Sequence, residues 1–246
     1  MVELQTRKKP SPFSEGDEIV EPYLALCGPH SNIILTPYRE LAVEEKEHTV
    51  DRLVELHNDE RVYRWLMSPP FPYKREHAES WISRSQRPRS SPPTAMKPWT
   101  LPPVQSIREI VVGDTGQTEL FIGDITLRRH VFEEVVDLQQ REALSKENLE
   151  RENGDPKIVW AVGNFLAPSH HGRGIATAAA RTLLDWAIPN MNIHRLIVQV
   201  FEGNFASARV YEKLGFVFRE AIKEAIPIAE SKGGGRRGIL VYTLER

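Results

Sequence analysis

A glycine-containing turn between an expected strand and an expected helix has the residue types best suited to bind an anion. It reads His171-Gly172-Arg173-Gly174-Ile175-Ala176. The start of a helix offers unpaired backbone N–H groups and the positive end of the helix dipole. Glycines let that backbone approach a ligand closely, and arginine suits phosphate. The turn therefore predicts a phosphate or pyrophosphate site, and a tight turn without a ligand is the alternative.

The residues around this turn exclude two common nucleotide-binding motifs. No Gly-Lys-Ser/Thr ends the turn, so it is not a Walker loop, and it lacks the Gly-x-Gly-x-x-Gly of dinucleotide folds. A second segment, NFASARVYEKLGF (204–216), follows the next expected strand and predicts a helix that Gly215 stops.

Two segments together resemble the acetyl-CoA-binding core of the GNAT superfamily of N-acetyltransferases. They are HHGRGIATAAARTLLDWAI and NFASARVYEKLGF. They are most similar to the branch that acetylates the alanine N-termini of ribosomal proteins, where a Gly-Tyr-x-Leu-x-Pro strand precedes Gln-Gly-Lys-Gly-Ile-Ala-Thr. The matching segments here are GNFLAP (163–168) and HGRGIAT (171–177). The resemblance covers about residues 157–218, with weaker agreement at 36–45, 71–82 and 122–127.

The resemblance implies acetyl-CoA as co-substrate and no metal. The backbone of Gly172 to Ala176 would hold the pyrophosphate, and the 165–167 edge would pair with the pantetheine arm in a gap between separating strands. For Asn204 and Ser207, helix capping alone is the alternative, and His171 would point either at phosphate or at water. The expected cofactor-binding residues are Phe165, Leu166, Ala167, His171, Gly172, Arg173, Gly174, Ile175, Ala176, Thr177, Asn204 and Ser207.

The implied chemistry is direct attack of a neutral amine on the thioester carbonyl. It needs a base for the amine proton, donors for the oxyanion and an acid near sulfur. Tyr211 occupies the position that in many relatives protonates the departing thiolate, and packing within the helix is its alternative role. A backbone N–H near Leu166 would polarise the carbonyl.

The general base is less evident from the sequence. Many relatives carry a glutamate on the strand before the phosphate loop, but IVWAVGNFLA has no acidic residue. Asp124, on the neighbouring strand, is the leading candidate, and a solvent-facing position is its alternative. Glu133, Glu134 and His130 are further candidates, and a water relay would need none of them.

The acceptor site is expected between residues 65–73 and 226–237, as the family arrangement implies. The expected acceptor-binding residues are Trp65, Phe71, Tyr73 and Asn164. Core packing explains Trp65 equally well. In the loop SKGGGRRG, Arg236 and Arg237 would recognise a carboxylate, or would lie at a solvated hairpin tip.

The periodicity of apolar residues predicts the elements that must position these groups. Strands are expected at 31–38, 106–113, 119–130, 157–168, 194–201, 216–226 and 237–246. Helices are expected at 41–66 with a break at Asn58-Asp59, and at 75–85, 172–188 and 204–214. This order predicts an α/β (α+β) protein with a sheet of mixed strand directions. The resemblance implies the GNAT fold, with a mixed, mostly antiparallel sheet splayed at the cofactor site and helices on both faces.

The length of 246 residues allows one large domain or two small ones. We expect a loose leader over 1–30 and a single domain over 31–246 with insertions at about 86–103 and 133–157. Nine of the 18 prolines lie within 69–103, which excludes regular structure over 86–103. The second insertion has eight acidic and four basic residues, so an exposed helix or a partly disordered segment is expected.

The composition narrows the class of protein. A net charge of −2 gives no basic excess for nucleic acid, and no apolar run is long enough for a membrane span. The single Cys27 excludes an intrachain disulfide and fits a reducing compartment, so a cytoplasmic protein is expected, with the nucleus open.

The predicted function is acetyl-CoA-dependent acetylation of a primary amine in a ternary complex, by a monomer or homodimer. The acceptor would be a protein or peptide N-terminus or a small-molecule amine. The alternative is a non-catalytic acyl-CoA-binding protein that has lost its base.

Overall fold

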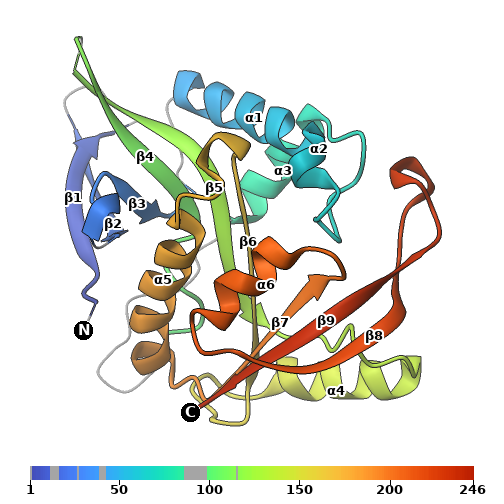
Figure 1. Cartoon of the computed structure of the whole chain (residues 1–246). Helices are drawn as coiled ribbons and strands as arrows, with labels where there is room; N and C mark the ends of the chain where they lie inside the picture. The colour runs from blue at the N-terminus through green and yellow to red at the C-terminus, as the bar shows by residue number, and fades with distance from the viewer. Residues whose placement is uncertain (1, 12–16, 27, 39–42, 86–98, 115) are drawn as a thin grey trace.

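The structure, a computed structural model, describes residues 2–11, 17–26, 28–38, 43–85, 99–114 and 116–246. Its centre is a nine-stranded sheet with the order β1-β2-β3-β4-β5-β6-β7-β9-β8. Among the described strand pairs, β6 and β7 run parallel and the others run antiparallel (Figure 1). The strands are β1 Gln5–Pro10, β2 Glu18–Ala25, β3 Ile33–Thr36, β4 Ser106–Gly113, β5 Gly116–Arg129, β6 Val159–Leu166, β7 Arg195–Phe201, β8 Val217–Pro227 and β9 Arg236–Glu245.

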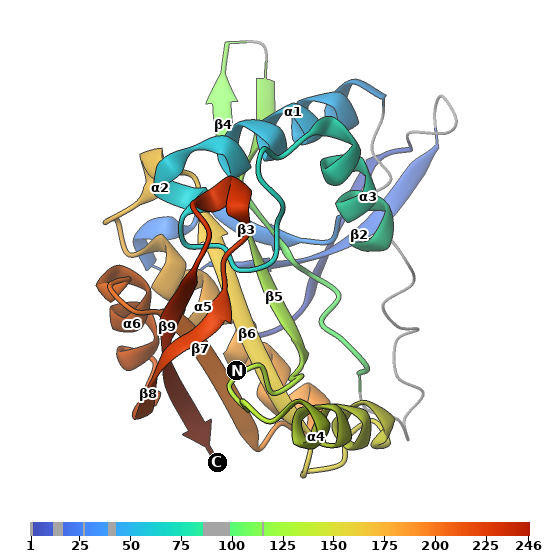
Figure 2. The ribbon, with the colours of Figure 1, turned by 90° about the vertical axis from the view of Figure 1, so that its right-hand side faces the viewer.

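Helices cover both faces of this sheet. Figure 2 shows α5 and α6 on one side of the central strands, and α3 and α4 on the other. The helices are α1 Val43–Asn58, α2 Glu60–Tyr63, α3 Arg75–Ser85, α4 Leu138–Glu150, α5 Ile175–Met191 and α6 Phe205–Glu212. Short 3-10 turns are η1 Gly28–His30, η2 Pro168–His170 and η3 Glu230–Lys232. Within the described residues, no helix combines the length and apolarity needed to cross a membrane.

The predicted fold class is confirmed, and local sequence signals account for the main elements. Helix α5 buries Ile175, Ala179, Leu183 and Ala187, a four-residue spacing that places one apolar stripe against the sheet. The expected break after α1 is also present, because Asp59 caps α2 by accepting a hydrogen bond from the Arg61 backbone N–H.

The expectation of a loose leader over 1–30 is wrong for its described part. Strands β1 and β2 pair with each other, and β2 pairs with β3, so they extend the sheet. Ion pairs hold the charged side chains of these strands, since Arg7 lies 2.8 Å from carboxylate oxygens of both Glu21 and Glu119. Leu24 is fully buried. Cys27 and residues 12–16 lie outside the described residues.

The structure describes the second expected insertion in full and the first only in part. Residues 133–157 contain α4, so the partly disordered alternative is wrong there. Asn148 fixes this helix, since its buried side-chain amide donates to the carbonyls of His130 and Val159. Of the proline-rich segment, 86–98 lie outside the described residues. Trp99 follows them and packs edge-on against Trp186 of α5, with ring centroids 5.5 Å apart.

The sheet opens between its two parallel strands. Pairing of β6 with β7 ends at Ala161↔Ile197. Beyond that point β6 continues to pair with β5 as far as Leu166↔Gly123, while β7 continues with β9 as far as Phe201↔Ile239. The edge of β6 over residues 162–166 therefore has no paired strand on the β7 side, and the predicted splay is present.

Candidate functional site

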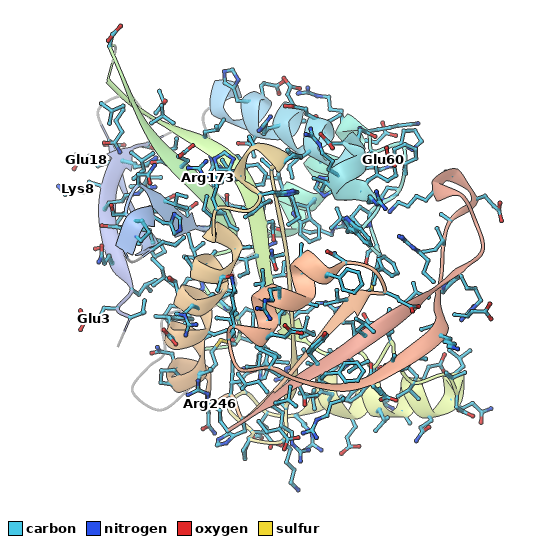
Figure 3. All side chains as sticks on the ribbon, in the orientation of Figure 1. Glu3, Lys8, Glu18, Glu60, Arg173 and Arg246 are labelled. Carbon is cyan, nitrogen blue, oxygen red and sulfur yellow. The ribbon has the colours of Figure 1, made fainter. Side chains whose placement is uncertain are left out.

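The glycine loop lies at the wide end of this splay. It leads from η2 into the 17-residue helix α5, whose N-cap is Gly174 (Figure 1). Gly172 has φ +72° and Gly174 has φ +79°, values that L side chains rarely adopt, which explains glycine at both positions. Residues 171–174 are exposed, and Figure 3 shows the labelled Arg173 on this loop. The loop thus offers free backbone N–H groups and a cation to an anionic ligand.

Side chains around the loop are held by their own contacts. The Nε2 of His171 lies 2.9 Å from the Leu166 carbonyl oxygen, so this ring is bonded to the end of β6. Ile175 and Ala167 are fully buried, so each would meet a ligand through its backbone alone. Thr177 is half-buried in the first turn of α5.

A histidine from the N-terminal segment also reaches the loop. The Nε2 of His30, in η1, lies 3.7 Å from the position that a Cβ on Gly174 would take. His30 is not among the predicted site residues, because no local motif in the sequence marks it.

Tyr211 lies beside the splay with its hydroxyl bonded to β6. The hydroxyl donates a 2.7 Å hydrogen bond to Oδ1 of Asn164, and the residue is 1% exposed. Burial raises the pKa of Tyr211 well above its usual range. The phenol is therefore protonated at neutral pH, and its single proton is donated to Asn164.

The alternation of β6 divides the expected site residues between the two faces of the sheet. Asn164 faces Tyr211 and the helices α5 and α6. Phe165, the next residue, faces the other way, where its ring lies 4.7 Å from that of His57. Phe165 pairs with Asp124 on β5, so Asp124 shares its face. Tyr211 and Asp124 thus lie on opposite faces.

Asp124 is buried, so its predicted alternative as a solvent-facing strand residue is wrong. It is 2% exposed, and its Oδ2 accepts hydrogen bonds from the Tyr38 hydroxyl at 2.7 Å and from the Gln105 side-chain amide at 2.9 Å. Burial, and then the charge of Asp124, raise the pKa of Tyr38. These contacts hold Asp124 among β3, β4 and β5.

His57, at the end of α1, is a site residue that the sequence analysis missed. Its Nδ1 lies 2.9 Å from the Leu53 carbonyl oxygen, an acceptor, so Nδ1 carries the ring proton and Nε2 is left as an acceptor. The ring stacks on Tyr73 at 4.3 Å. Burial lowers the pKa of His57 to about 4, so the ring is neutral. The spacing Leu53–His57 within a buried helix face was the available signal.

The expected acceptor-binding residues do not form one group. Tyr73 joins His57, while Asn164 faces the opposite side of the sheet. Trp65 packs on the cluster around Phe201, at the end of β7. Phe71 stacks on Tyr63 with ring centroids 4.2 Å apart, and no described contact joins it to the other three.

The two arginines expected in the loop SKGGGRRG, Arg236 and Arg237, begin β9, and both are hydrogen-bonded to the protein itself. Arg237 donates to the Arg64 carbonyl oxygen at 2.6 Å and lies over the Trp65 ring at 5.2 Å. Arg236 donates to the carbonyl oxygens of Glu224 and Ala225. Arg237 therefore joins the last hairpin to α2, rather than extending from a solvated tip.

A histidine between two carboxylates lies at the other end of β5. The Nε2 of His130 lies 2.8 Å from Oε2 of Glu134, and its Nδ1 lies 3.6 Å from Oε2 of Glu133. The Gln199 side-chain amide on β7 also donates to Oε2 of Glu134, at 2.7 Å.

Asn204 acts as the N-cap of α6. Its Oδ1 accepts a hydrogen bond from the Ser207 backbone N–H at 3.2 Å. Capping is thus present, and contact of Asn204 or Ser207 with a cofactor stays a prediction.

The chain is similar to known acetyltransferases. The family profile described as the acetyltransferase (GNAT) domain matches residues 41–217, well over half of the chain. The chain is 42% identical over 55 residues to the probable N-acetyltransferase YjcK of Bacillus subtilis, covering 22% of this chain and 30% of that protein. It is 32% identical over 101 residues to the putative ribosomal N-acetyltransferase YdaF of the same organism, covering 41% and 51%. It is 33% identical over 52 residues to spermidine N(1)-acetyltransferase of Escherichia coli, covering 21% and 28%.

Solved structures extend the similarity to nearly the whole chain. A GNAT-family acetyltransferase from Bacillus anthracis has a TM-score of 0.56 at 16% identity, covering 91% of this chain and 98% of that one. RimJ of Mycobacterium smegmatis, in complex with CoA-disulfide, has a TM-score of 0.53 at 17% identity, covering 87% and 81%. At these identities the structures show a shared fold, whereas the sequence matches span at most about half the length of the curated relatives. The profile match over residues 41–217 shows that this chain belongs to the GNAT acetyltransferase family.

Proposed function

We propose that the protein is an acetyl-CoA-dependent N-acetyltransferase. The observation that carries this proposal is the splay between β6 and β7, which has the exposed glycine loop at one end and the buried Tyr211–Asn164 pair alongside. An anion site, an unpaired strand edge and a protonated acid lie in that order along one gap. A thioester with a phosphate-bearing tail needs these three features.

The residues present fit coenzyme A. The backbone N–H groups of 172–176 would hold the pyrophosphate at the start of α5, with Arg173 adding charge. The β6 edge over 162–166 would accept the amide groups of the pantetheine arm as a strand accepts a neighbour. Bound acetyl-CoA supplies an activated acetyl group as a thioester.

The chain's own residues then complete the transfer. The amine nitrogen forms a bond to the thioester carbon, the carbon–sulfur bond breaks, and the amine loses one proton while the thiolate gains one. Tyr211 donates that proton to sulfur when its O–H turns away from Asn164, the acceptor that it contacts in this structure. Because the phenol oxygen is already held beside the splay, only this rotation is needed when charge develops on sulfur.

The acceptor is a primary amine on the sheet face of Phe165, His57 and Tyr73, opposite Tyr211. Attack from that face leaves the thiolate on the Tyr211 side. We favour a protein or peptide N-terminus, because the match to the ribosomal N-acetyltransferase YdaF is nearly twice as long as the match to the spermidine enzyme. A cytoplasmic location stays a prediction.

An acceptor screen tests this function. Purified protein with acetyl-CoA is offered alanine- and serine-terminated peptides, spermidine and free amino acids, and free thiol release is measured. We expect release with at least one amine and greatest release with a peptide. Cofactor binding with no acceptor used would instead support the acyl-CoA-binding alternative, which the absence of an acidic residue on β6 favours.

A further inference from the structure

The strongest unassigned feature is the buried imidazole of His130 between two carboxylates. His130 is 1% exposed. The ligand atoms of His130, Glu133 and Glu134 lie within 4.8 Å of one another. Glu133 also accepts a hydrogen bond from Arg128 at 2.7 Å, and that arginine helps to lower the pKa of Glu133 against the effect of burial.

Some polar atoms of this cluster have hydrogen-bond partners and others do not. The Nδ1 of His130 and Oε2 of Glu133 are both buried without a hydrogen-bond partner among the described residues, and they face each other at 3.6 Å. Oε2 of Glu134 accepts from both His130 and Gln199, whereas its Oε1 has no described hydrogen bond and is not among the buried unpartnered atoms. Oε1 is therefore the open oxygen.

The position of Gln199 brings Glu134 to the splay. Gln199 is two residues beyond Ile197, the last β7 residue paired with β6. By strand alternation it shares a face with Ile197 and Phe201, and these pack with Trp65. This is the face of Phe165 and His57. Glu134 thus lies where the strands separate, on the acceptor side and opposite Tyr211.

We propose that Glu134 is the general base that takes the proton lost by the acceptor amine, and that His130 and Gln199 position it. This inference rests on the proposed acetyltransferase function. When the nitrogen has bonded to the thioester carbon, its extra proton passes to Oε1 of Glu134, directly or through one water. Tyr211 supplies the separate proton that sulfur needs and regains one from water after the thiol has left. Glu134, with its side chain 12% exposed, returns its proton to water.

The other two candidates are less suited to this role. The Nδ1 proton of His57 is bonded to a backbone carbonyl, so a proton accepted at Nε2 has no onward route through the ring. Asp124 is 2% exposed and its Oδ2 is occupied by two donors.

The experiment compares Glu134→Gln with Glu142→Gln. Glu142 lies on the exposed side of α4 without a described ion pair, so it gives the same change of charge nearby. With the peptide or spermidine that the wild type acetylates, we expect Glu134→Gln to lower kcat by about 10²- to 10⁴-fold. The KM for acetyl-CoA should change by less than about threefold. Glu142→Gln should behave as wild type.

The pH profile separates a base from a structural residue. The groups that contact Glu134 are His130, the residue that follows β5, and the neutral Gln199 from β7. Glu133, Arg128 and the neutral Asn148 of α4 surround His130. We expect the residual rate of Glu134→Gln to keep rising with pH where the wild-type rate has levelled off, because hydroxide replaces the lost base. His130→Gln, which keeps a donor toward Glu134, should retain more activity than His130→Ala.

The outcomes are distinguishable. Thermal melting and the acetyl-CoA-induced shift establish that each variant folds and binds cofactor. If the wild type acetylates an amine and folded Glu134→Gln does so equally fast, Glu134 is not the base. If activity is lost with EDTA and restored by Zn²⁺, the cluster holds a metal and the assignment is wrong. If the wild type acetylates no amine, the proposed function itself fails.

Discussion

The Tyr211 hydroxyl donates a 2.7 Å hydrogen bond to Asn164 across the gap between α6 and the unpaired part of β6. This contact fixes the phenol beside the path expected for the thioester. It also ties the helix after β7 to the strand before the glycine loop, so the proposed acid and the strand edge proposed to bind the cofactor are positioned together.

Tyr211→Phe removes that hydroxyl and keeps the ring. We expect kcat to fall by about 10²-fold or more, because the thiolate loses its acid, with acetyl-CoA affinity retained. Stability should fall by about 1 kcal/mol, since Asn164 loses its donor. Tyr63→Phe is the control, because the Tyr63 hydroxyl has no described hydrogen bond. Unchanged kcat in Tyr211→Phe would leave Tyr211 with a packing role alone.

Gly174→Asp tests the anion site. An aspartate there puts a negative charge where phosphate is expected, so the rise in Tm caused by acetyl-CoA should disappear. Gly235→Asp is a matched control, because Gly235 has φ +74°, close to the +79° of Gly174, and lies in the β8–β9 loop. Gly235→Asp should lose a similar amount of stability from backbone strain and should keep the rise in Tm caused by acetyl-CoA. Loss of the shift in both variants would contradict an anion site at Gly174.

His57→Phe tests the burial of a neutral imidazole. The pKa of His57 is about 4 in the folded protein, below its ordinary value, so the unfolded chain binds the proton more tightly. Its contribution to stability is complete above about pH 6.5 and is lost as pH falls toward 4, by at most about 1.4 kcal/mol per pH unit. The free energy of unfolding, measured in urea at several pH values in this range, should depend less steeply on pH in His57→Phe than in the wild type. Phenylalanine keeps the stack on Tyr73. Equal slopes would mean that His57 is not buried in its neutral form.

Asp124→Asn tests the other candidate base. Because Asp124 accepts hydrogen bonds from Tyr38 and Gln105, we expect a stability loss of about 1–3 kcal/mol by denaturant unfolding. The shape of the pH profile of kcat should be that of the wild type. Asp185→Asn, at an exposed position of α5, should change neither property. A flattened acidic side of the Asp124→Asn profile would instead assign the base to Asp124.

The local pattern of apolar residues and turn residues was sufficient to predict many of the helices and strands of this fold. The helix 75–85 and the strand 106–113 have the predicted bounds, because apolar spacing and flanking breakers are local properties. The glycine loop could be assigned for the same reason, since positive φ at two positions needs glycine in the sequence itself. Strands β1 and β2 could not be predicted from local pattern, because their charged residues form ion pairs with partners as distant in sequence as Glu119.

The sequence by itself determined the family and the position of the glycine loop, since each depends on residues that are neighbours along the chain. Only the tertiary structure decided which face of the sheet each group occupies and which polar groups meet. A one-residue step along β6 places Asn164 beside Tyr211 and Phe165 beside His57, on opposite sides. The contact of Glu134 with Gln199 spans 65 residues of chain. Contacts of that range are set by packing and register, which no local motif encodes.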